Sequence, residues 1–113
     1  MNRGVRTVIY PVKDIARAKK LYGKLLGEPM MDKPYYVGWR VGDQDIGLDP
    51  SGHSQGMTGA VAYWHVDDIQ KTLRSLLDAG AESLQSPKDV GGGKLVAMAK
   101  DEDGNMIGLI QEP

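Results

Sequence analysis

The stretch Val61-Ala62-Tyr63-Trp64-His65-Val66-Asp67-Asp68-Ile69 decides the fold of this sequence. Its first six residues are mostly β-branched or aromatic, as is typical of a strand. Asp67 or Asp68 then provides the N-cap of a helix that ends at Gly80. The apolar stripe of this helix comprises Ile69, Leu73, Leu76 and Leu77. The segment therefore predicts a strand that leads directly into an amphipathic helix.

The same pattern occurs once before, beginning near Thr7. A strand is expected over residues 8–12, Asp14 provides the N-cap, and Gly27 ends the helix. The apolar stripe of this earlier helix comprises Ile15, Ala18, Tyr22 and Leu25. Because caps and stripes recur in the same order, the sequence indicates two copies of one supersecondary unit.

Each copy continues as strands after its helix. In the first copy we expect strands over residues 35–41 and 45–48, and in the second over residues 94–100 and 106–111. The last strand of each copy carries the same tripeptide, Ile-Gly-Leu. The strands thus extend the repeat beyond the helices.

Residues 50–56 have the composition of a linker, and residues 87–93 read as a second loop. We therefore place unit one at about residues 5–50 and unit two at about residues 58–112. A chain of 113 residues has the usual size of one domain, so residues 1–113 are predicted to form a single domain.

Composition and charge narrow the possible partners. The chain has no cysteine, which excludes disulfides and thiolate metal ligands and favours the cytoplasm. Its net charge of −1 creates no field that attracts nucleic acid or a membrane surface. No apolar run approaches the ~20 residues that span a bilayer. We expect a cytoplasmic protein that binds small molecules or proteins, with no nucleic-acid or membrane partner.

Three groups of residues resemble a known superfamily in their order and spacing. They are Val12-Lys13-Asp14-Ile15 with Leu25-Leu26-Gly27, Val66-Asp67-Asp68-Ile69 with Ala79-Gly80-Ala81, and the turn Asp101-Glu102-Asp103-Gly104-Asn105. The sequence resembles the vicinal oxygen chelate superfamily, which includes glyoxalases, bleomycin resistance proteins and extradiol dioxygenases. Glu102 departs from the pattern, because the family usually has proline at this position of the turn.

The resemblance implies an α+β fold of two tandem βαβββ units. Each sheet would curl into a half-barrel, with the helix on the convex side and a ligand cavity on the concave side. Two half-barrels would enclose one cavity, either within one chain or across two chains. At this length we expect a homodimer.

The resemblance also implies where a metal ion would be held. Enzymes of the family use His, Glu or Gln side chains from the first and last strand of each unit. The matching positions here are Thr7, Gly47, Val61 and Gly108. None of these residues is a strong ligand for zinc or for a harder divalent ion. We therefore expect no metal site and no other cofactor.

His65 is the one candidate catalytic residue. By strand alternation it shares a face with Tyr63 and faces the presumed cavity, where an imidazole can bind a ligand or act as a base. A structural, hydrogen-bonded histidine is the favoured alternative, because no Ser, Cys or carboxylate beside it in sequence completes a catalytic set. A metal site that uses His65 with Asp45 or Asp49 is a further alternative, with an incomplete ligand set.

The aromatic residues point to a small-molecule site. The sequence has two Trp and five Tyr but no Phe, so every ring carries a polar group. An apolar pocket with aromatic walls and a few polar groups is the usual form of a ligand site, although core packing explains each single ring equally well. The predicted ligand-contacting residues are Tyr36, Trp39, Asp45, Asp49, Tyr63 and His65.

These features leave three functional hypotheses. The leading one is metal-independent binding of a planar or aromatic molecule, a drug or metabolite that the protein sequesters as bleomycin resistance proteins do. The first alternative is an enzyme, either a glyoxalase-like lyase or isomerase or a dioxygenase-type enzyme, with a non-standard site. The second is a regulatory interaction module whose cavity is vestigial.

Overall fold

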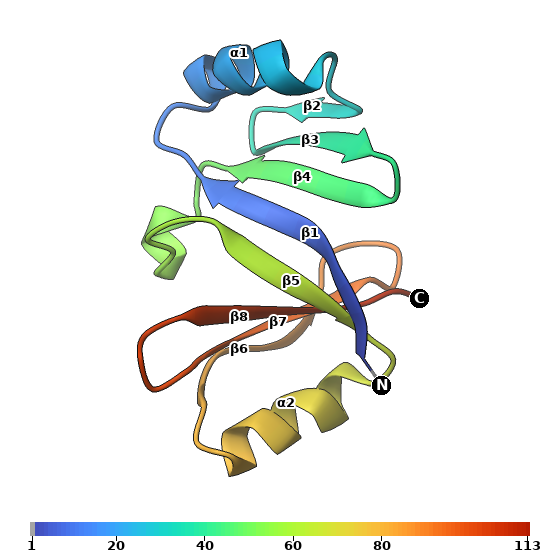
Figure 1. Cartoon of the computed structure of the whole chain (residues 1–113), viewed down its shortest axis with the longest axis vertical. Coiled ribbons are helices and arrows are strands. Elements are labelled where there is room, and N and C mark those ends of the chain that lie inside the picture. The colour runs from blue at the N-terminus through green and yellow to red at the C-terminus, as the bar shows by residue number, and fades with distance from the viewer. Residues whose placement is uncertain (1) are drawn as a thin grey trace. The chain divides into compact units, whose positions relative to one another are not determined.

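The computed structural model describes residues 2–113. These residues form two compact units, whose elements are labelled in Figure 1. The N-terminal unit comprises residues 6–61, and the C-terminal unit comprises residues 62–113 together with residues 2–5. No helix within the described residues is long and apolar enough to cross a membrane.

Both units contain the same series of elements. The N-terminal unit holds most of β1 (Asn2–Pro11), then α1 (Ile15–Leu26), β2 (Met31–Lys33), β3 (Tyr36–Val41) and β4 (Gln44–Asp49). The C-terminal unit holds β5 (Val61–Val66), α2 (Ile69–Asp78), β6 (Glu82–Asp89), β7 (Leu95–Lys100) and β8 (Met106–Gln111). A short 3-10 helix, η1 (His53–Gln55), lies inside the segment predicted as a linker.

In each unit the first strand lies beside the last. The strand order is β2-β3-β4-β1 in the N-terminal unit and β5-β8-β7-β6 in the C-terminal unit. β1 pairs with β4 in parallel, as β5 does with β8, while the remaining pairs within each unit are antiparallel. This topology confirms the predicted α+β fold of two βαβββ units.

The core of the N-terminal unit lies between α1 and one face of its sheet. The helix contributes four residues to this core, namely Ile15, Ala18, Tyr22 and Leu26. Leu25, predicted to belong to this stripe, is 79% exposed. That prediction is wrong: at 100° per residue, positions 25 and 26 lie on opposite edges of the stripe, and it is Leu26 that packs against the sheet.

The core of the C-terminal unit is formed in the same way by α2. Ile69 and Leu73 are buried, Leu76 packs against them, and Leu77 lies at the edge of the stripe with 37% of its surface exposed. Asp68 is the N-cap, because its carboxylate accepts a hydrogen bond from the backbone N–H of Lys71 at 3.0 Å.

Two edge strands were not predicted from the residues. β2 is exposed along its whole length, and β6 is exposed at most positions, so neither shows the alternation of a half-buried strand. The predicted loop over residues 87–93 is therefore partly wrong, since Pro87 to Asp89 belong to β6. Proline and lysine suit such an edge because they discourage pairing with a further strand.

We predict that Leu48→Ala will lower the free energy of unfolding by about 2–5 kcal/mol, because a fully buried side chain leaves a cavity. Val90→Ala is the control, and we expect a change below about 0.5 kcal/mol for this exposed loop residue. Chemical denaturation followed by circular dichroism measures both. Similar losses for the two variants would contradict the packing of α1.

Candidate functional site

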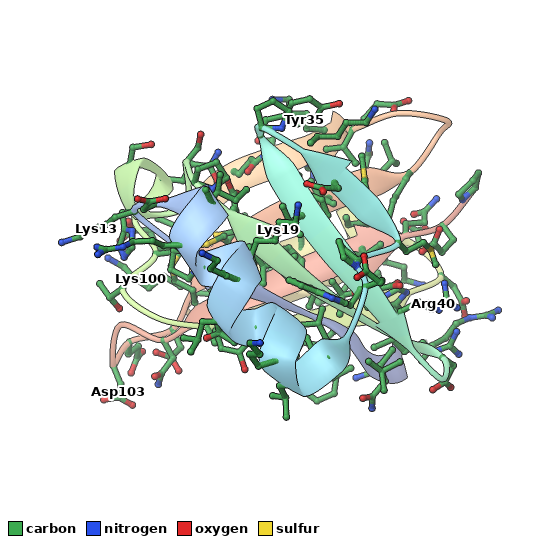
Figure 2. All side chains as sticks on the ribbon, turned by 90° about the horizontal axis from the view of Figure 1, so that it is seen from above. Lys13, Lys19, Tyr35, Arg40, Lys100 and Asp103 are labelled. Carbon is green, nitrogen blue, oxygen red and sulfur yellow. The ribbon has the colours of Figure 1, made fainter. Side chains whose placement is uncertain are left out.

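One face of the N-terminal sheet carries a set of polar residues around a tyrosine. Val37, Trp39 and Leu48 point toward α1, so the alternate residues of the same strands lie on the opposite face. We call this surface the Tyr36 face; it comprises Tyr36, Gly38 and Arg40 of β3 with Asp45, Gly47 and Asp49 of β4. Figure 2 shows Arg40 at one end of β3 and Tyr35 just before its other end.

The ring of Tyr36 lies directly against the backbone of two glycines. Gly38 and Gly47 are paired neighbours on β3 and β4. A Cβ atom added at Gly38 would lie 2.9 Å from Cε2 of Tyr36, and one at Gly47 would lie 2.5 Å from its Cζ. Any larger residue at Gly47 therefore has to displace the phenol, which occupies the space of the missing side chain.

The electrostatic surroundings keep the Tyr36 hydroxyl protonated. Burial, and then the negative charges of Asp45 and Asp49, raise the pKa of Tyr36 to about 12. At neutral pH the phenol is consequently a hydrogen-bond donor. Within residues 2–113 its hydroxyl makes no hydrogen bond, so this donor is available to a ligand.

The two carboxylates of this face differ in their partners. Asp45 lies 3.4 Å from the guanidinium of Arg40, measured between Oδ1 and Nη1. Asp49 accepts a hydrogen bond from the backbone N–H of Ser51 at 2.8 Å, but no cationic side chain of the described chain lies within ion-pair distance of it. Asp49 thus keeps an unneutralised, partly buried negative charge.

The C-terminal unit repeats the contact between a tyrosine and a glycine. Tyr63 of β5 is paired with Gly108 of β8, and a Cβ atom at Gly108 would lie 2.5 Å from Cδ2 of the ring. Trp64 is paired with Leu109, which packs in the α2 core. Tyr63 and His65 therefore lie on the face away from α2, in the alternation expected from the sequence.

His65 has a carboxylate nearby that the sequence did not suggest. It is 5% exposed, and its Nδ1 lies 3.7 Å from Oε1 of Glu112. The ammonium of Lys94 lies 3.9 Å from the same oxygen. Glu112 lies near His65 because β5 pairs with β8 in a register that places His65 beside Ile110. This register cannot be predicted from a single sequence.

The predicted site residues therefore fall into separate groups. Tyr36, Asp45 and Asp49 share the Tyr36 face, whereas Tyr63 and His65 share a face of the other unit.

Trp39 lies on the α1 side of its sheet. It is 2% exposed, and its indole N–H donates a hydrogen bond to the backbone carbonyl of Gly27 at 2.8 Å. It thereby holds the end of α1, and its predicted ligand contact stays a prediction.

The residues at the four family ligand positions do not fit a divalent metal ion. Thr7 offers one hydroxyl oxygen, Val61 offers no donor, and tyrosine rings stand on Gly47 and Gly108. Among the described residues no group of three or more His, Asp or Glu side chains is placed to hold a metal. We therefore derive no chemistry through a metal ion.

A family model described as the Glyoxalase/Bleomycin resistance protein/Dioxygenase superfamily matches residues 4–109, nearly the whole chain. The chain belongs to this superfamily. This confirms the resemblance inferred from the capped helices and the Asp101 turn. No curated protein matches the chain.

Solved structures share the fold of this superfamily member at low sequence identity. A superfamily member from Vibrio splendidus 12B01 is 18% identical with a TM-score of 0.72, covering 99% of this chain and all of its own. A hypothetical protein from Bacillus halodurans is 15% identical with a TM-score of 0.75, covering 99% and 95%. The Mn(II)-bound glyoxalase from Novosphingobium aromaticivorans is 19% identical with a TM-score of 0.70, covering 98% of this chain and 40% of its own. At these identities the likeness concerns the fold alone.

We predict that Tyr36 will titrate at about pH 12. Because its pKa is raised above the ordinary value of 10.0, the associated stabilisation is complete below pH 10 and is lost as the pH rises toward 12. Ultraviolet difference absorbance of tyrosinate measures the titration. Tyr36→Phe should remove the transition near pH 12, whereas Tyr35→Phe, at an exposed position, should retain it.

We predict that Gly47→Ala will destabilise the protein by about 1–3 kcal/mol, since the new methyl group overlaps the Tyr36 ring. In a Tyr36→Ala background the same substitution should cost much less, because the overlapping ring is gone. A double-mutant cycle measured by chemical denaturation gives this coupling. Additive effects would mean that the ring does not rest on Gly47.

Proposed function

We propose that this protein binds a planar or aromatic small molecule on the Tyr36 face, without a resident metal ion and without chemical conversion. The observation that carries the proposal is the Tyr36 ring itself, a largely buried aromatic surface surrounded by a few polar groups. Such a combination is typical of small-molecule sites, in which an apolar surface supplies affinity and polar groups fix orientation.

The polar groups on this face can orient a bound ring. The Tyr36 hydroxyl can donate one hydrogen bond, while Asp49 can accept from a ligand donor. Arg40 and Asp45 are partly exposed and paired with each other at 3.4 Å. Sequestration of a drug or a metabolite requires only such contacts, since binding alone removes the molecule from solution.

The two contacts between tyrosine and glycine support metal independence. In the superfamily the last strand of each unit would supply a metal ligand, and here Gly47 and Gly108 occupy the matching positions. A longer ligand side chain at either position would have to displace a ring. We propose that binding energy in this protein comes from the aromatic surfaces instead.

We also propose that the protein works as a homodimer in the cytoplasm. Large exposed apolar side chains on the N-terminal unit, Leu21, Leu25 and Met30, at 67% or more exposure, support an association between chains. The absence of cysteine from the sequence supports a reducing compartment. Light scattering coupled to gel filtration tests the dimer, and elution at the mass of one chain would contradict it.

An enzyme that uses His65 is the second candidate function. The observation that favours it is the carboxylate of Glu112, 3.7 Å from Nδ1, which can orient the imidazole as a base. Glu112→Gln should then abolish any conversion of a bound substrate while leaving its binding intact. A binding protein would show binding without product under the same conditions.

We predict that the purified protein will carry substoichiometric metal and that Zn²⁺, Ni²⁺, Mn²⁺ or Fe²⁺ will not raise its melting temperature. A ligand that binds the native state raises the melting temperature, and we expect planar aromatic compounds to have this effect. A free ligand concentration of one hundred times Kd raises the free energy of unfolding by about 2.7 kcal/mol. Metal analysis and thermal melting give both readouts. One tightly bound ion with an upward shift would instead make a metal-dependent enzyme the better reading.

A further inference from the structure

We infer that the Tyr36 face selects a planar organic cation, such as an arylamidinium or a protonated arylamine, with Asp49 as the group that recognises the positive charge. This inference rests on the proposed function, because it names the class of ligand that the same face would take. It follows from three features of the face: its aromatic ring, its uncompensated carboxylate and the arrangement of its other charges.

The aromatic ring favours a cation over an anion. The electron-rich face of a tyrosine attracts a cationic group that lies within about 6 Å of the ring. The Tyr36 ring lies against the backbone of Gly38 and Gly47, and this contact favours a preorganised surface. The ring is uncharged at neutral pH, as is any tyrosine of ordinary pKa, and its raised pKa of about 12 extends this to higher pH.

Asp49 supplies the charge that an organic cation would neutralise. It is partly buried, which makes an unpaired carboxylate unfavourable, and its carboxylate accepts a hydrogen bond from the neutral N–H of Ser51. Asp45, by contrast, is already paired with Arg40. The carboxylate left without a cationic partner is thus the one that a ligand cation would contact.

The other charges of this face do not reverse this preference. Lys33 of β2 is paired with Tyr36 in the strand register, but it is exposed and forms no ion pair with Asp45 or Asp49. Arg40 is paired with Asp45, which lies toward the opposite end of β4 from Asp49. The hydroxyl of Tyr36 experiences the two carboxylates as its principal charged neighbours. A carboxylate on a ligand ring would therefore meet repulsion beside this hydroxyl.

Benzamidine, benzamide and benzoate test the inference, because they share one ring and differ in charge. Titration of the full chain by calorimetry at low ionic strength measures their affinities. We expect benzamidine to bind about tenfold more tightly than benzamide, as one cation–carboxylate contact allows, and benzoate to bind most weakly. Added salt should weaken the binding of benzamidine and leave that of benzamide unchanged.

Asp49→Asn is the decisive variant, because the amide oxygen can still accept from Ser51 N–H while the charge is removed. It should bring the affinities of benzamidine and benzamide to within about twofold of each other. Asp43→Asn, in the exposed turn between β3 and β4, is the matched control and should retain the wild-type preference. Tyr36→Phe keeps the ring and should retain the preference for the cation as well.

The outcomes separate the inference from the proposed function. Equal affinities for the three compounds, or tighter binding of benzoate, would overturn the cation selectivity while leaving a planar-ligand site. An undiminished preference in Asp49→Asn would overturn the role of Asp49. Failure of all three compounds to bind, while other planar compounds raise the melting temperature, would overturn the inference alone, and failure of every planar compound would overturn the proposed function with it.

Discussion

In both units, the contact between a tyrosine ring and a glycine of the last strand determines which side chain covers the centre of the sheet. In each unit the last strand lies beside the first in parallel, so its central residue falls in the interior of the sheet. A side chain at Gly47 or Gly108 would itself occupy the space above the centre of the sheet. Because glycine has no side chain, a tyrosine ring from a neighbouring strand occupies this space, Tyr36 at Gly47 and Tyr63 at Gly108. The centre of each sheet is thereby covered by an aromatic ring.

The two contacts between a tyrosine ring and a glycine lie in different electrostatic surroundings. Tyr36 has the carboxylates of Asp45 and Asp49 as its neighbours, and they raise its pKa together with burial. The face that carries Tyr63 instead holds His65, followed by the pair of Glu112 and Lys94 near the strand ends. Because a ligand responds to charge as well as to shape, the two faces offer different contacts despite their common architecture.

The fold was predictable from the sequence because its signals are local. Asp14 caps α1 through the N–H of Arg17, and Gly27 ends the same helix at a positive φ of 85°. Leu25 and Leu26 could not be told apart, since the choice between adjacent apolar residues depends on the sheet beneath the helix. The edge strands β2 and β6 escaped prediction because exposed residues leave no periodic pattern.

The site was less predictable, because it depends on register between strands that are distant in sequence. Tyr36 and Trp39 are three residues apart on β3, and strand alternation places them on opposite faces. Only the pairing of Gly38 with Gly47 shows that the Tyr36 ring has two glycines beneath it. The same superfamily fold at 15–19% identity thus constrains the backbone, while the chemistry of the face depends on a few residues such as Gly47 and Asp49.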